Sequence, residues 1–235
     1  MNAFLTDGSL LSLVDQFRPI KAVLFDLDGT LLDSEQLTDH LMSDYLIAAG
    51  KTPNPRELSR FHGVTWTEVV KRFYQIAPDF SGSISADILR EKFDTHIVSE
   101  SVRQIEKASE FVSEASQYFR CVVVSSSPRS TIMKALERLQ ILSCIEFFIG
   151  EEDTEKPKPA PDPYLHALTQ LGLPATQALT FEDSDAGITS SMVAGMWTIG
   201  INRRNGEFSQ ELELEPHLTI DTYADLPAEF CNMRR

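Results

Sequence analysis

Two aspartates stand one residue apart at the end of an apolar segment. Asp26 and Asp28 follow the residues KAVLF and precede Gly29 and Thr30. Paired carboxylates repel each other, so a cation, a shared proton or a reacting phosphate must offset the repulsion. An ionised Asp26 can attack phosphorus, and a protonated Asp28 can give its proton to the leaving oxygen. The pair predicts phosphoryl chemistry. The alternative is a calcium-binding or capping turn, which the early glycine and the preceding strand disfavour.

A run of three serines, Ser125 to Ser127, follows a second apolar segment. The hydroxyl of Ser125 and the N–H groups beside it suit a phosphate at the start of a helix. The simpler reading of this run is helix capping by Ser127, with Pro128 as the first helical residue. We therefore expect either a phosphate contact or a cap here.

Two more segments carry charged groups that suit the same chemistry. The proline-rich loop 155–163 holds Lys156 and Lys158, either of which can act as a point charge beside anions or remain solvated. Glu182 and Asp183 follow another apolar run. Asp183 and Asp26 together would give Mg²⁺ the carboxylates it prefers, whereas the alternative for Asp183 is a helix N-cap.

Strands alternating with helices must position these groups. Apolar runs predict strands at 21–26, 121–125, 146–149, 178–182 and 197–201, with helical periodicity between them. This alternation predicts an α/β fold, a Rossmann-like, doubly wound parallel sheet. Ligands collect at the carboxyl ends of the strands in such sheets, and Asp26, Ser125 and Asp183 stand at or just past three of these ends.

Residues 33–100 break the alternation, because they show helical patterns and no strand. The apolar stripes comprise Leu37, Leu41, Tyr45 and Leu46, and then Ile84, Ile88, Leu89, Phe93 and Ile97. Asp33 and Gln36 predict the start of the first helix, and Thr65 with Glu68 predicts a later one. We expect an α-helical cap domain at 33–100, inserted into a core made of 21–32 and 101–235, after an N-terminal extension at 1–20.

The composition excludes several classes of protein. The net charge is −14, which disfavours a nucleic-acid partner. No apolar run approaches the roughly 20 residues that span a bilayer, so no membrane is expected. The three cysteines are too few and too scattered for a disulfide framework or a zinc site. The amphipathic N-terminus does not resemble a signal peptide, so the cytoplasm is the expected location. Both a monomer and a dimer are compatible with this sequence.

Taken together, the motifs DLDGT, SSS, KPAPD and EDSDAG resemble, in this order, those of the haloacid dehalogenase-like (HAD) superfamily. The similarity is greatest to the branch that contains β-phosphoglucomutase and phosphoglycolate phosphatase, with a helical (C1) cap. It implies Asp26 as the nucleophile, Asp28 as the acid and base, and Ser125 and Lys158 as the phosphoryl-holding groups, Lys158 being chosen because it begins KPAPD. The implied Mg²⁺ ligands are Asp26, Asp28 through its backbone carbonyl, Asp183 and Glu182.

The implied activity is hydrolysis of a small phosphate monoester, such as a sugar phosphate, through an aspartyl-phosphate. The predicted substrate-binding residues are Thr30, Ser126, His62 and Gly63, with His62 as a hydrogen-bond donor. Two alternatives stay open: a sugar-phosphate mutase, and a non-enzymatic phosphate-sensing or partner-binding protein. Trp66 stands where mutases of this branch carry a phosphate-clamping arginine, which disfavours a mutase unless Arg129 or Lys71 compensates.

Overall fold

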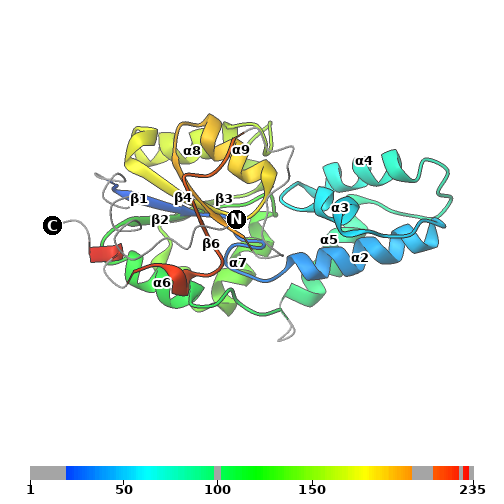
Figure 1. The fold of residues 1–235 in the computed structure, drawn as a ribbon, viewed down its shortest axis with the longest axis horizontal. Coiled ribbons are helices and arrows are strands. Elements are labelled where there is room, and N and C mark those ends of the chain that lie inside the picture. Colours follow the sequence, from blue (N-terminus) through cyan, green and yellow to red (C-terminus); the bar gives the residue numbers. More distant parts are fainter. Residues whose placement is uncertain (1–19, 98–101, 203–213, 228–229, 233–235) are drawn as a thin grey trace, which may run out of the picture.

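The computed structural model describes residues 20–97, 102–202, 214–227 and 230–232. A parallel sheet of six strands lies at the centre, in the order β3-β2-β1-β4-β5-β6 (Figure 1). The strands are β1 (Ala22–Phe25), β2 (Arg120–Val124), β3 (Phe147–Ile149), β4 (Ala178–Glu182), β5 (Trp197–Ile201) and β6 (Leu218–Ile220). The predicted α/β fold is confirmed. The predicted N-terminal extension lies outside the described residues, except for Ile20.

Five of the six strands are those that the sequence predicts, with ends that differ by at most one residue. They are apolar because helices cover both faces of the sheet, and nearly all their side chains are buried. Strand β6 is not predicted from the sequence. This edge strand has only three residues, and its middle side chain, Thr219, is exposed. So short an alternation falls below what periodicity can detect.

Helices pack on the two faces of the sheet (Figure 1). The helices α6 (Ala108–Ala115) and α7 (Arg129–Arg138) lie on one face, and α8 (Asp162–Leu171) and α9 (Asp185–Val193) lie on the other. Phe25, Phe111 and Phe181 pack against one another in the core on the first side, with ring centroids 5.2–6.2 Å apart. This burial of apolar side chains is the main force that holds the strands in register.

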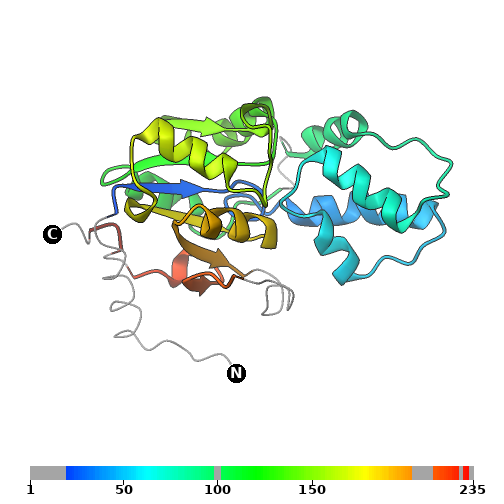
Figure 2. The ribbon, with the colours of Figure 1, turned by 90° about the horizontal axis from the view of Figure 1, so that it is seen from above.

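The helices α2 (Glu35–Ala48), α3 (Pro55–Leu58), α4 (Trp66–Ile76) and α5 (Ala86–Ile97) form a separate group beside the sheet (Figures 1 and 2). We call residues 35–97 the helical insertion. Two backbone hydrogen bonds join the segments that lead into and out of it: Asp33 N–H to Arg103 O at 2.7 Å, and Ile105 N–H to Leu31 O at 3.0 Å. The domain boundaries at 33 and 100 stay a prediction. None of the described helices is long and apolar enough to cross a membrane.

Two predicted helix starts are wrong, and both errors concern serines near Asp28. The N-cap of α2 is Ser34 rather than Asp33, and that of α7 is Pro128 rather than Ser127. Neither serine hydroxyl caps a helix, because both donate to the Asp28 carboxylate. The predicted start at Thr65 is confirmed, since its side chain accepts from the N–H of Glu68.

Several side chains connect the helical insertion with α7 and with the loops beside the sheet. Ser126 Oγ donates to the carbonyl oxygen of Gly63 at 3.1 Å. The Asp94 carboxylate on α5 accepts from Thr131 Oγ1 at 2.6 Å and from Lys134 Nζ at 3.1 Å, both on α7. An ion pair joins Arg90 and Glu151 at 3.3 Å. These contacts hold the insertion over the ends of the strands.

Candidate active site

Three neighbouring strands end at one level and deliver polar groups to the same edge of the sheet. Phe25 of β1 lies in register with Val123 of β2 and Phe181 of β4. The residues that follow, including Asp26, Ser125 and Asp183, therefore meet, because the carboxyl ends of parallel strands share an edge. The structure thus brings together three predicted site residues, of which Ser125 and Asp183 lie about 100 and about 160 residues after Asp26 in the sequence.

Gly29 permits the closest approach within this edge. Its φ is +86°, and a Cβ built on it would lie 1.8 Å from Asp183 Oδ2. A larger residue would be strained in this backbone conformation and would displace the carboxylate. Thr30, predicted to contact substrate, instead donates its hydroxyl to Asp183 Oδ1 at 3.2 Å. The turn after β1 thus fixes Asp183 in place.

Lys158 is the buried cation of the site. Its ammonium group donates to Asp26 Oδ1 at 2.7 Å, to the carbonyl oxygen of Val124 at 2.9 Å, and to the Glu182 carboxylate. Burial alone would lower the pKa of Lys158, but the charges of Asp26 and Glu182 raise it well above its usual value. The structure places Lys158, and not the exposed Lys156, beside Asp26.

The carboxylate of Asp28 has a different environment from that of Asp26. It accepts from Ser34 Oγ and from Ser127 Oγ, each at 2.7 Å. Burial raises the pKa of Asp28, while the two serine hydrogen bonds lower it in part. The pKa of Asp26 is raised well above its usual value by burial, which outweighs the opposing charge of Lys158. Both groups therefore hold protons more tightly than exposed aspartates do.

Three carboxylates form a cluster with the geometry of a metal site. One oxygen atom each of Asp26, Glu182 and Asp183 lies within 4.8 Å of the others. Asp183 Oδ2 is buried and accepts no hydrogen bond among the described residues. Burial, and then the charges of Glu35 and Asp26, raise the pKa of Asp183 well above its usual value. A hard divalent cation such as Mg²⁺ fits this set of oxygen donors and would satisfy the free oxygen atom.

Two predicted metal ligands, Glu182 and Asp28, also have hydrogen-bond partners within the protein. The Glu182 side chain accepts hydrogen bonds from Lys158 and from the hydroxyl of Tyr164, so it also neutralises the lysine. The Asp28 carboxylate is outside the group of three, because the two serines hold it. Metal coordination by the backbone carbonyl of Asp28 stays a prediction.

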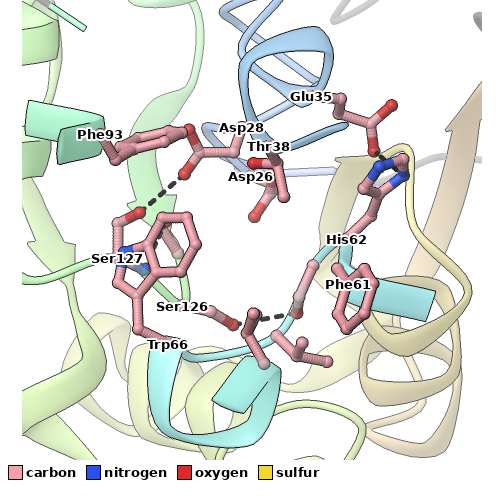
Figure 3. A pocket seen from close by; sticks show the side chains of 14 residues that line it. Asp26, Asp28, Glu35, Thr38, Phe61, His62, Trp66, Phe93, Ser126 and Ser127 are labelled. Atoms are coloured by element: carbon pink, nitrogen blue, oxygen red, sulfur yellow. Dashed lines mark hydrogen bonds and ion pairs between the residues drawn. The ribbon is translucent and has the colours of Figure 1, made fainter. Parts of the chain in front are cut away.

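A pocket opens between this edge of the sheet and the helical insertion (Figure 3). Asp26, Asp28 and the three serines 125–127 line it from the sheet side. The insertion contributes polar and apolar groups, namely Glu35, Thr38, Phe61, His62, Gly63, Val64, Trp66, Val69 and Phe93. The predicted site residues Ser125, Ser126, His62 and Gly63 therefore surround one cavity. Their contact with a substrate stays a prediction.

His62 is held between two carboxylates of α2. Its Nδ1 lies 3.0 Å from Glu35 Oε1, and its Nε2 lies 2.7 Å from Asp39 Oδ1. Burial lowers the pKa of His62, but the hydrogen bonds and charges of Asp39 and Glu35 outweigh it and raise the pKa to about 9. Both ring nitrogens are engaged here, so neither is left to donate to a substrate as the sequence analysis expected.

The raised pKa of His62 predicts a pH-dependent contribution to stability. The pKa of His62 is about 9 in the folded state and has a usual value of 6.5, so its contribution to the free energy of unfolding is complete below pH 6.5. This contribution, roughly 3 kcal/mol in total, is lost as the pH rises through about 9. We expect His62→Asn to lose most of this pH dependence in urea unfolding between about pH 6 and about pH 10.

The exposed His40 lies on the same helix as Glu35 and Asp39 and provides the control. His40→Asn should keep the wild-type profile. A His62→Asn profile parallel to that of the wild type would show that the two carboxylates do not hold a charged imidazolium.

Gly63 allows the helical insertion to approach the sheet, which predicts a cost for any side chain there. Its φ is +67°, and a Cβ built on it would lie 2.1 Å from Ser184 Oγ. We expect Gly63→Ala to lower stability by about 1 kcal/mol through backbone strain. It should also lower catalytic efficiency by about tenfold or more, because the insertion is pushed away from the site.

Gly50 separates these two effects. It also has a positive φ, +72°, but a Cβ built on it would have nothing within 4 Å. Gly50→Ala should therefore lose similar stability and keep the wild-type catalytic efficiency. Equal catalytic losses in the two variants would mean that contact with Ser184 does not matter for activity.

Several groups of this site are not predicted from the sequence. Glu35, Thr38 and Asp39 lie on the first turns of α2, and Ser34 and Ser127 hold Asp28. One signal could have revealed Glu35 and Thr38. They are polar, yet they occupy the buried face of α2 together with Met42 and Leu46. Polar residues on the buried face of a helix that starts beside a motif indicate a site.

Comparisons with known proteins agree with this geometry. The curated protein named "Putative pyrophosphatase PpaX" from Caldanaerobacter subterraneus is 30% identical over 195 residues, which are 77% of this chain and 81% of that protein. Hexitol phosphatase A from Escherichia coli is 27% identical over 182 residues, which are 77% and 83% of the two chains. The crystal structure of CbbY from Rhodobacter sphaeroides has a TM-score of 0.73 at 20% identity, and covers 91% of this chain and 100% of its own, which shows a shared fold.

The family model described as "Haloacid dehalogenase-like hydrolase" matches residues 23–201. This range begins in β1 and ends with β5, so it includes all the motifs and the helical insertion. The resemblance inferred from the motifs is therefore confirmed. The chain belongs to the haloacid dehalogenase-like hydrolases.

Proposed function

We propose that the protein is a Mg²⁺-dependent phosphatase that hydrolyses a small phosphate monoester through an aspartyl-phosphate on Asp26. The observation that carries the proposal is the contrast between two neighbouring aspartates. Asp26 is paired with the ammonium group of Lys158, whereas Asp28 accepts hydrogen bonds from two neutral hydroxyl groups. The names of the relatives support a small phosphorylated substrate, since they refer to pyrophosphate and to hexitol phosphate.

The two aspartates would act in two steps. In the first, an oxygen of Asp26 bonds to phosphorus while the ester P–O bond breaks, and Asp28 gives its proton to the leaving oxygen. In the second, Asp28 takes a proton from water, the water oxygen attacks phosphorus, and the bond to Asp26 breaks. Lys158 and Ser125 would hold the phosphoryl oxygens, and the helical insertion would exclude bulk water.

Asp26 and Asp183 would hold the metal ion, with Glu182 behind them. The ion would supply positive charge against the phosphoryl oxygens, which also offsets the repulsion among the carboxylates. Asp183, whose Oδ2 has no partner among the described groups, would gain the most from it.

Metal removal tests this proposal. We expect phosphate release from a panel of small phosphate monoesters in Mg²⁺, and a loss of about 100-fold or more in EDTA. Activity should return when Mg²⁺ is added in excess. The same addition should raise the melting temperature, because a ligand that binds only the folded state stabilises it. Undiminished release in EDTA would exclude the metal.

The two alternatives predict other results with the same protein. A sugar-phosphate mutase would release little phosphate, but would convert glucose 1-phosphate in the presence of a bisphosphate primer. A phosphate-sensing protein would do neither. The cytoplasm stays the predicted location.

A further inference from the structure

The pocket over Asp26 has two walls of opposite character. Trp66 and Phe93 lie on one side, and Glu35 and His62 lie on the other (Figure 3). The Trp66 and Phe93 rings pack edge to face, with centroids 5.2 Å apart, and both side chains are buried. The first wall offers mainly aromatic surface to a bound molecule, with the indole N–H of Trp66 as the polar group of these two side chains. The second wall offers charge.

That charge is negative overall. His62 has two carboxylate partners, Glu35 and Asp39, so the three side chains together carry one net negative charge when the imidazole of His62 is protonated. Asp28 adds a further acid on the sheet side. Among the described residues, none of the 14 that line the pocket is a lysine or an arginine. An anionic group placed here would face acids and aromatic rings.

The nearby cations are engaged elsewhere. Lys71 pairs with Glu68 on the outside of α4, and its side chain is mostly exposed. Arg129, the other residue that could stand in for the phosphate-binding arginine of the mutases, pairs with Asp153 and lies over the Phe148 ring. Neither residue lines the pocket. Lys158 is bonded to Asp26 and Glu182 at the bottom of the site, where the transferred phosphoryl group would lie.

We propose that this pocket takes phosphomonoesters whose leaving group carries no second anionic group and packs against Trp66. This inference rests on the proposed phosphatase function and names its substrate class. A second phosphate or a carboxylate would lose its hydration and meet the Glu35 side of the pocket without a compensating cation. An uncharged polyol or sugar can present C–H groups to the Trp66 ring and keep its hydroxyls towards the polar wall.

Matched pairs of substrates test the proposal. Glycerol 3-phosphate and 3-phosphoglycerate differ in a hydroxymethyl group and a carboxylate, and fructose 6-phosphate and fructose 1,6-bisphosphate differ in one phosphate. With Mg²⁺ present, we expect the member of each pair whose leaving group is uncharged to have a kcat/KM at least about tenfold higher than that of the other member. Pyrophosphate, whose leaving group is itself a phosphate, should be a poor substrate.

Variants at Trp66 assign the preference to this wall. Trp66→Arg places a cation in the pocket and should reduce or reverse the ratio of the two kcat/KM values within each pair. Trp66→Phe keeps an apolar wall and should retain this ratio. Glu35→Gln removes a negative charge from the opposite wall and should also narrow the ratio, should Trp66→Arg fail to fold. Thermal unfolding identifies the folded variants.

The outcomes separate the two proposals. If the esters with a charged leaving group are hydrolysed as efficiently as their partners, or more efficiently, the proposed substrate class is wrong. The proposed phosphatase function would still hold. Absence of hydrolysis of all compounds, with and without Mg²⁺, would overturn the phosphatase itself. An unchanged ratio in both Trp66→Arg and Glu35→Gln would show that these walls do not select the substrate.

Discussion

Asp26→Asn is expected to reduce phosphate release by about 10⁴-fold or more, since loss of a nucleophile removes the covalent route. Asn keeps the shape of the side chain but its amide is a far weaker nucleophile. Lys158 keeps Glu182 as a partner, so the fold should survive the change. Phosphate release measured with Mg²⁺ and substrate in excess gives the comparison, and thermal unfolding checks that the variant is folded.

Asp44, an exposed acid on α2, provides a matched control. Asp44→Asn makes the same change in net charge and should retain wild-type activity. Quenching the wild-type reaction in acid should also trap a phosphoryl group on the protein, detected by mass spectrometry and absent in Asp26→Asn. Retention of activity in Asp26→Asn to within tenfold would rule out Asp26 as the nucleophile.

Lys158→Met is expected to cause the largest loss of stability. It leaves the Asp26 and Glu182 carboxylates buried without their cation, and breaking a buried pair in this way costs about 3–5 kcal/mol. For a chain of this size, this corresponds to a fall in melting temperature of roughly 6–20 °C. Activity should be lost as well. The measurement is the free energy of unfolding in urea at neutral pH.

The exposed Lys156 gives the control two residues away, and Lys156→Met should change stability by no more than about 0.5 kcal/mol. The loss in Lys158→Met should shrink at lower pH, because the unpaired Asp26 carboxyl, whose pKa is raised by burial, then binds a proton in the folded state. Its stability therefore falls as pH rises. A variant as stable as the wild type at both pH values would contradict the electrostatic role of Lys158.

Much of the fold and the chemistry can be predicted from short segments of the sequence. The strands are continuous apolar runs, because helices cover both faces of the sheet, and each reactive group directly follows one of them. Asp26, Ser125 and Asp183 could therefore be assigned to one edge of the sheet before their contacts were known. Lys158 could be chosen only by the likeness of KPAPD to a family motif, since nothing local distinguishes it from Lys156.

Partnerships between distant side chains could not be predicted in the same way. Local rules assign Ser127 to a helix cap, but a tertiary hydrogen bond to Asp28, 99 residues earlier, prevails. His62 appeared free to bind substrate because its partners, Glu35 and Asp39, lie 27 and 23 residues away on another helix. These contacts depend on how the helical insertion sits over the sheet, which periodicity does not specify.

Ser34 connects the position of the helical insertion to proton transfer. It immediately precedes α2, and its hydroxyl is one of three groups, with Ser127 and Lys158, that lower the pKa of Asp28 against the larger effect of burial. The same segment brings in Glu35, the first residue of α2, whose charge raises the pKa of Asp28. The start of α2 therefore acts on the Asp28 proton in two opposite directions. Any change in its position would alter the acid strength of Asp28 together with the enclosure of the pocket.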